Sequence, residues 1–147
     1  MLRDVLTPQL VITDLDAHTK QDVISALLEM LCTTGKVKDR ALAERDILAN
    51  ELRTATGMQH GIAIPHAKTD AVDELVACVA VSRNPIDFDS LDRKPAYIFV
   101  MTLSPTGQTG PHMRFLAEVG RLLKNKKVRR AILEADSPEA LLRAFVG

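Results

Sequence analysis

The sequence of 147 residues has no tryptophan and only one tyrosine. Single-stranded nucleic acids bind to platforms of stacked aromatic side chains, and this scarcity argues against that class of partner. An excess of charge of either sign is also missing, because 19 Lys and Arg residues balance 19 Asp and Glu residues. A neutral chain exerts no overall attraction on nucleic acid or anionic membrane, so any partner surface must be a local patch.

Long hydrophobic runs are absent as well. The longest apolar run, Ala96 to Leu103, is far shorter than the roughly 20 residues that a membrane-spanning helix needs. The first ten residues, MLRDVLTPQL, are interrupted by charges and a proline, which is not the layout of a signal peptide. The only cysteines, Cys32 and Cys78, lie in apolar stretches, as is typical of buried thiols in a reducing compartment. We therefore expect a cytoplasmic protein with no direct membrane insertion.

The pattern of apolar residues predicts one α/β domain over residues 1–147. A hydrophobic share of 46% and a charged share of 26% are ordinary for a globular chain that can bury a core. Strand-like runs occur at 10–12, 61–64, 74–82 and 96–103. Helical periodicity occurs at about 20–34, 40–52, 112–123, 128–133 and 137–146. Because helices and buried strands are interspersed, we expect a mixed β-sheet covered by helices on both faces.

Several boundaries carry local signals. Thr19, followed three residues later by Asp22, resembles a capping box at the start of the first long helix. Gly35 is placed to end that helix, and Asp39 is placed to cap the next one. Ser137 followed by Pro138 is a further start signal.

The segment TGMQHGIAIPHAK, Thr56 to Lys68, holds two of the four histidines. Pro65 fixes its own φ and forces Ile64 into an extended conformation, so His66 leaves the strand on a defined path. Lys68 places a cation nearby, which suits an anion such as a phosphoryl group. A histidine in this position can act as a nucleophile when one ring nitrogen is unprotonated. The alternative is a histidine that merely caps backbone groups in a turn.

His112 is the second candidate for phosphate chemistry. It follows a loop rich in Gly and Pro, residues 104–111, and in this prediction it opens a helix. The positive N-terminus of a helix attracts phosphate, although an ordinary first-turn residue facing solvent has the same sequence context.

Arg53 and Thr56 lie where the helix predicted at residues 40–52 ends. Arg53 can offer its guanidinium to a phosphate or only complement the helix dipole.

Other clusters give weaker signals. His60 lies six residues before His66, but the spacing matches no strong zinc pattern. A metal-dependent hydrolase built on His60, His66 and His112 stays as a minor alternative, and we expect neither a metal nor an organic cofactor. The basic run at residues 121–130 fits a solvated face, with docking of an acidic partner as the alternative.

TGMQHGIAIPHAK, together with PIDFDSLDRKPAYIFVMTLSP and HMRFLAEVGRLL, resembles the enzyme IIA components of the phosphoenolpyruvate:sugar phosphotransferase system. The likeness is to the fructose/mannitol type and its nitrogen-regulatory relatives, and it covers nearly the whole chain. It implies a single-domain enzyme IIA type-2 fold and a phosphotransferase function. His66 would accept a phosphoryl group from an HPr-type carrier and pass it to a IIB component, with His112 assisting. The weaker candidates for stabilising the phosphate are Arg53, Thr56, Lys68 and His60.

The sequence also departs from the pattern of that family. Relatives often have arginine at the position of Asn50, and Gly-Asn at the positions of Gln59 and His60. The resemblance thus predicts that His60 lies near the phosphorylation site and changes the choice of donor or the pH response. A chain with no attached IIB or IIC domain favours a nitrogen-type regulatory role. The remaining alternatives are a non-catalytic regulatory binding module with the same fold and a relative that is never phosphorylated.

Overall fold

A mixed five-stranded sheet forms the centre of the structure, a computed structural model that describes residues 2–146. The strands are β1 (Val11–Leu15), β2 (Ile62–Ala63), β3 (His66–Lys68), β4 (Val76–Ile86) and β5 (Ala96–Ser104). Their order is β1-β4-β5-β2, and β3 also pairs with β5. The two long strands β4 and β5 are antiparallel, whereas β1, β2 and β3 each run parallel to their partner. The predicted mixed sheet is confirmed.

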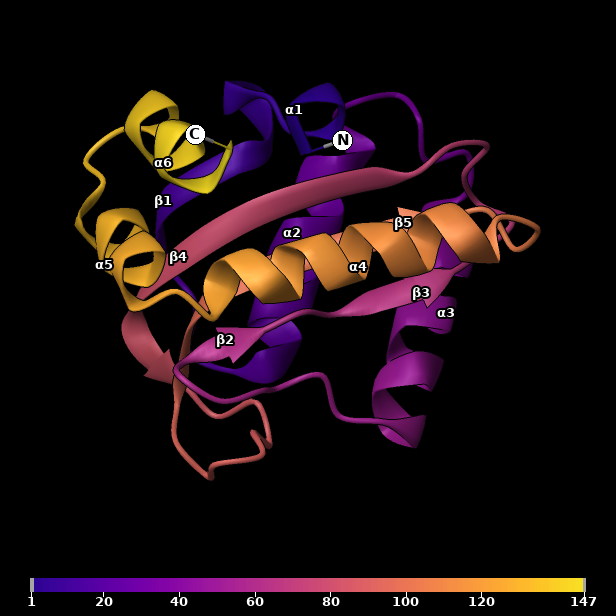
Figure 1. Ribbon diagram of the computed structural model, residues 1–147. Coiled ribbons are helices and arrows are strands. Elements are labelled where there is room, and N and C mark those ends of the chain that lie inside the picture. The colour runs from indigo at the N-terminus through magenta and orange to yellow at the C-terminus, as the bar shows by residue number, and fades with distance from the viewer. Residues whose placement is uncertain (1, 147) are drawn as a thin grey trace.

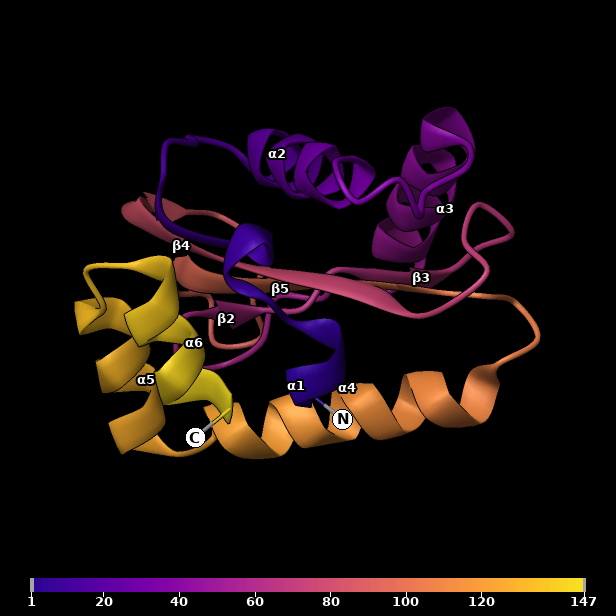
Figure 2. The same cartoon turned by 90° about the horizontal axis from the view of Figure 1, so that it is seen from above.

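Helices cover both faces of this sheet. They are α1 (Leu2–Val5), the short 3-10 helix η1 (Pro8–Leu10), α2 (Lys20–Cys32), α3 (Arg40–Arg53), α4 (Thr109–Leu123), α5 (Lys126–Glu134) and α6 (Pro138–Val146). Figure 2 shows α2 and α3 on one side of the sheet and α1, α4, α5 and α6 on the other. Among residues 2–146, no helix combines the length and the apolar character that crossing a membrane requires.

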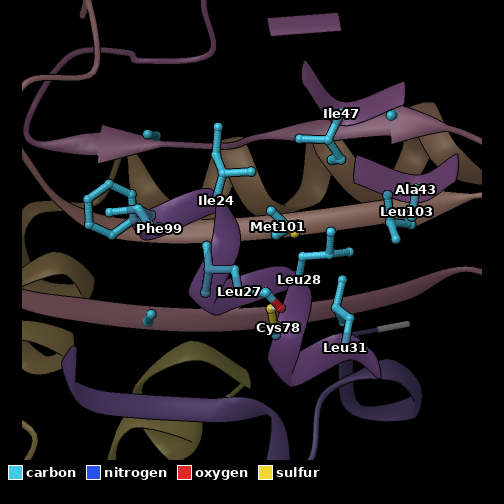
Figure 3. Close-up of a cluster of buried hydrophobic side chains, with 14 of the residues drawn as sticks. Ile24, Leu27, Leu28, Leu31, Ala43, Ile47, Cys78, Phe99, Met101 and Leu103 are labelled. Atoms are coloured by element: carbon cyan, nitrogen blue, oxygen red, sulfur yellow. Dashed lines mark hydrogen bonds between the residues drawn. The ribbon is translucent and has the colours of Figure 1, made fainter. Parts of the chain in front are cut away.

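Two hydrophobic clusters, one on each face, follow from the alternation of side chains along the strands. On β5, Phe99, Met101 and Leu103 join the cluster beneath α2 and α3, whereas Ile98 and Val100 join the cluster beneath α4 and α6. Figure 3 shows the first cluster, in which leucines of α2 lie against the sulfur-containing side chains of β4 and β5. The long strands are therefore buried on both faces, which explains why their sequences are apolar without interruption.

The predicted helix signals act as expected. The Thr19 hydroxyl accepts a hydrogen bond from the Asp22 N–H at 3.1 Å, and Asp39 Oδ1 accepts one from the Leu42 N–H at 3.1 Å. Gly35, just after α2, has a φ of +76°, a backbone conformation that glycine adopts at little cost. Both cysteines are free thiols; Cys78 is fully buried, and burial raises its pKa.

The N-terminus of α4 differs from the prediction. The helix begins at Thr109, so His112 is its fourth residue and does not open it. Pro111 in the first turn is compatible with a helix, because the first N–H groups of a helix have no intrahelical partner. The other large difference is β4, which begins at Val76 and continues to Ile86, beyond the predicted end of the strand at residue 82.

Candidate functional site

One pocket gathers most of the residues that the sequence singled out. It has a volume of about 490 Å³ and lies between α3, β3, the loop after β5 and the first turn of α4. Figure 1 shows α3 beside β3, and the N-terminal end of α4 on the same side of the molecule. Its walls consist of Asp46, Ala49, Asn50, Arg53, His66, Ala67, Lys68, Thr106, His112 and Met113.

His66 is the first residue of β3 and lies half-buried in the wall of this pocket. Its Nδ1 lies 2.8 Å from the carbonyl oxygen of Ile64. A carbonyl oxygen can only accept a hydrogen bond, so Nδ1 carries the hydrogen and the lone pair of the neutral ring is on Nε2. Asn50 Nδ2 donates to the backbone carbonyl of His66 at 2.7 Å. The ring and the backbone of His66 are therefore both held by hydrogen bonds.

His112 is buried, with 3% of its surface exposed, and the centroid of its ring lies 5.5 Å from that of His66. Its Nδ1 lies 2.7 Å from the hydroxyl of Ser104. The pKa of His112 is lowered to about 4, first because burial disfavours the charged ring and then because the charges of His66 and Lys68 oppose it. The ring is therefore neutral at pH 7, and the alternative of a solvent-facing first-turn residue is wrong.

Two cations stand at the rim of the pocket. Arg53 is exposed and donates from Nη2 to Asn50 Oδ1 at 2.9 Å. Lys68 is exposed and donates to the hydroxyl of Thr109 at 3.2 Å. One carboxylate, that of Asp46, also lines the pocket. The balance of charge at the rim remains positive, which suits a dianionic phosphoryl group.

Thr56 lies outside this pocket, contrary to its selection as a phosphate-stabilising residue. It is buried, its hydroxyl donates to Glu51 Oε1 at 2.6 Å, and its N–H donates to Glu51 Oε2 at 2.9 Å. Glu51 is not among the residues predicted from the sequence. The signal was present, because Ala43, Ile47 and Glu51 are spaced by four residues and share the buried face of α3.

His60 also lies outside the pocket of His66, which corrects the expectation that it belongs to the phosphorylation site. It lines a second pocket of about 380 Å³ beside β2 and the C-terminal end of α4. The two pockets share no residue. His60 has a φ of +64°, in the left-handed region where Asn and His are enriched. Its position therefore follows from the geometry of the turn before β2.

The separation of His60 also removes the geometric basis of the metal-dependent hydrolase. That alternative required His60, His66 and His112 around one ion, and only the last two lie together. In the described part of the chain, no group of three or more His, Cys, Asp or Glu side chains is placed to hold a metal ion.

Comparison with known protein families matches residues 4–146 to the family described as "Phosphoenolpyruvate-dependent sugar phosphotransferase system, EIIA 2". A fructose-specific EIIA component of Haloferax volcanii is 39% identical over 123 residues, which cover 84% of this chain and 80% of the relative. A fructose-specific EIIABC component of Bacillus subtilis is 31% identical over 141 residues. That match covers 96% of this chain but only 22% of the much longer Bacillus protein.

Solved structures with the same fold come from bacterial proteins. The nitrogen regulatory protein IIA-Ntr of Neisseria meningitidis superposes with a TM-score of 0.91 at 22% identity, and 97% of each chain is covered. A complex of enzyme IIAMtl with phosphorylated enzyme IIBMtl from Escherichia coli superposes with a TM-score of 0.83 at 18% identity, again over 97% of each chain. At these identities the likeness establishes the fold.

Proposed function

Because the chain belongs to the EIIA 2 family of the phosphoenolpyruvate-dependent sugar phosphotransferase system, we propose that His66 is its phosphoryl acceptor. The observation that carries this assignment is the hydrogen bond of 2.8 Å from His66 Nδ1 to the carbonyl of Ile64. It fixes the proton on Nδ1 and leaves Nε2 as the nucleophile. The ring lies in the wall of a pocket that is open to a partner's surface.

In the transfer step, the lone pair of His66 Nε2 attacks the phosphorus atom of a phosphohistidine on the donor. The new N–P bond forms as the donor's N–P bond breaks, and that electron pair returns to the donor's ring nitrogen. The Nδ1–H proton stays on His66, where the carbonyl of Ile64 stabilises the positive charge that develops on the ring. Such a reaction depends on alignment and charge neutralisation more than on covalent chemistry by the protein.

His112 assists as a hydrogen-bond donor to the phosphoryl group. When the Ser104 hydroxyl donates to His112 Nδ1, the hydrogen of the neutral ring resides on Nε2. Because the pKa of His112 is low, its ring is uncharged at pH 7 and places no positive charge beside the ring of His66. A buried, neutral donor of this kind is preorganised, and preorganised donors stabilise developing charge effectively.

Arg53 and Lys68 supply positive charge at the rim, where the phosphoryl oxygens would lie. Asn50 connects the two parts of the site, because its amide donates to the backbone of His66 and accepts from Arg53. We propose that Arg53 substitutes for the arginine that the family resemblance would place at position 50.

We further propose an HPr-type carrier in the cytoplasm as the donor, and a IIB component or a regulatory target as the acceptor. One structural neighbour was solved as a complex of IIA with phosphorylated IIB. In this chain, Met113 lines the pocket with 57% of its surface exposed. An exposed apolar side chain beside a reactive histidine fits the rim of a transient protein interface.

The test is phosphorylation from phosphoenolpyruvate with enzyme I and HPr-type carriers. The wild-type protein is expected to acquire an acid-labile, base-stable phosphohistidine, and His66→Ala is expected to acquire none. His60→Ala is the matched control, since that histidine lies in the other pocket, and it is expected to label normally. Full labelling of His66→Ala would overturn the assignment.

A further inference from the structure

Glu51 carries a buried carboxylate that the phosphoryl transfer described above does not use. Only 8% of its surface is exposed. It accepts hydrogen bonds from the N–H and the hydroxyl of Thr56 at 2.9 and 2.6 Å, and its Oε2 lies 2.7 Å from Lys20 Nζ. A buried charge is costly unless it is paired and hydrogen-bonded. Such a complete set of partners indicates that the position of this carboxylate is tightly defined.

The counter-ion of Glu51 is itself held in place. Lys20 begins α2, and its ammonium group lies 5.0 Å from the centroid of the Phe88 ring and 3.3 Å from Asp89 Oδ2. Helices α2 and α3 and the loop after β4 therefore meet at one charged cluster. Thr56 is attached to this cluster by two hydrogen bonds from a single residue.

Two further hydrogen bonds lead from Thr56 to the reactive ring. The Thr56 carbonyl accepts from the Ile64 N–H at 3.1 Å, and the Ile64 carbonyl accepts from His66 Nδ1 at 2.8 Å. The Ile64 carbonyl determines which ring nitrogen of His66 carries the proton. The position of this carbonyl is therefore fixed through Thr56. Without the carboxylate, the Thr56 N–H and hydroxyl would be buried without partners, and the loop would have to move to satisfy them.

We propose that Glu51 is a positioning residue for His66, and that it fixes the Nδ1–H tautomer of that ring through Thr56 and Ile64. This inference rests on the proposed role of His66 as phosphoryl acceptor. The tautomer, however, exists in the unphosphorylated protein and can be measured without any donor. A purely structural role of Glu51 would change stability and leave the tautomer as it is.

The experiment compares wild-type protein with Glu51→Gln, in which one donor to the carboxylate loses its acceptor while the shape is kept. ¹⁵N NMR of the histidine rings is expected to show a single Nδ1–H tautomer for His66 in the wild type and a mixture in Glu51→Gln. Phosphoryl uptake is expected to fall on the order of tenfold to a hundredfold, as misplacement of a reacting group does elsewhere. Glu44→Gln, two turns earlier on α3, is the matched control and is expected to match the wild type in both measurements.

An unchanged tautomer in Glu51→Gln overturns the proposal, whether or not the rate falls. If that variant does not fold, Thr56→Val keeps the Lys20–Glu51 pair and removes only one hydrogen bond. It is then expected to shift the tautomer in the same direction, and a folded Thr56→Val with an unchanged tautomer counts against the proposal. If the wild type takes up no phosphoryl group from any carrier, the proposed function fails, while the tautomer data still decide the role of Glu51.

Discussion

The rings of His66 and His112 lie 5.5 Å apart between centroids and are tilted by 51°. They come from β3 and α4, which are separated by about 40 residues in sequence, and they share one pocket. Burial is the main reason that the pKa of His112 is lowered, and repulsion from His66 and Lys68 adds to it, so the buried member of the pair is neutral at pH 7. In the proposed function, the half-buried His66 would accept the phosphoryl group and the buried His112 would assist it.

Replacement of His112 by Gln is expected to slow phosphoryl uptake by His66 roughly a hundredfold, as loss of one preorganised donor does in other enzymes. The fold should persist, because glutamine can still bond to the Ser104 hydroxyl. Initial rates with a phosphorylated carrier measure the effect, and circular dichroism verifies folding. A rate equal to that of the wild type would remove His112 from the reaction.

The low pKa of His112 also predicts how stability depends on pH. The ring titrates near 6.5 in the unfolded chain and at about 4 in the folded protein. Below pH 6.5 the unfolded state therefore binds a proton that the folded state does not, and stability is lost as the pH falls toward 4. The loss attributable to His112 is about 3 kcal/mol at pH 4. Urea unfolding between pH 7 and pH 4 should show a shallower decline for His112→Gln than for the wild type.

The exposed His18 provides the control for that measurement. His18→Gln is expected to reproduce the pH dependence of the wild type, because the side chain lies at the surface. A decline in His112→Gln that is as steep as in the wild type would show that other groups account for the acid sensitivity.

Much of the fold could be predicted because its signals are local. The caps Thr19 and Asp39 and the uninterrupted apolar strands need no knowledge of distant contacts. The start of α4 was misplaced because Gly110 and Pro111 resemble a loop in composition, although a proline is tolerated in the first turn of a helix. The position of Pro111 in the first turn therefore matters more for the start of α4 than the loop-like composition of this segment.

The site was predictable only in part. The extended backbone that leads to His66 could be predicted from Pro65, but the burial of His112 depends on where α4 lies against β5. The hydroxyl of Thr56 suggested a phosphate-stabilising residue, and only the structure reveals that this hydroxyl donates to Glu51. His60 is close to His66 in sequence and is nevertheless in another pocket, because β2 and β3 pair with successive parts of β5.

The bridge formed by Asn50 leads to a prediction about Arg53. Arg53→Gln removes the positive charge and is expected to slow phosphoryl uptake. Arg53→Lys keeps the charge but loses the planar arrangement of donors, so its uptake rate is expected to lie between those of Arg53→Gln and the wild type. Asn50→Ala removes the hydrogen bond to the His66 carbonyl and is expected to cost about 1 kcal/mol of stability as well as activity. Rates and urea unfolding measured on all three variants separate these effects. Equal rates for Arg53→Gln and the wild type would exclude Arg53 from the phosphate site.

Gly57 and Gly120 form a matched pair for testing the packing of the loop that carries Thr56. A Cβ atom on Gly57 would lie 2.5 Å from the carbonyl oxygen of Phe88 and 2.7 Å from the hydroxyl of Ser90. Since the Phe88 oxygen belongs to the backbone, it cannot move aside without moving the chain. Gly57→Ala is therefore expected to destabilise the protein by about 1–3 kcal/mol and, because Thr56 is its neighbour, to slow phosphoryl uptake.

At Gly120, in α4, nothing lies within 4 Å of the added atom. Alanine restricts the unfolded chain and favours the helix, so Gly120→Ala is expected to stabilise by about 0.5–1 kcal/mol and to leave uptake unchanged. Thermal unfolding and transfer rates of the two variants are measured together. If Gly57→Ala were as stable and as active as the wild type, the loop would have room to move, and the rigid connection from Glu51 to His66 would lose its support.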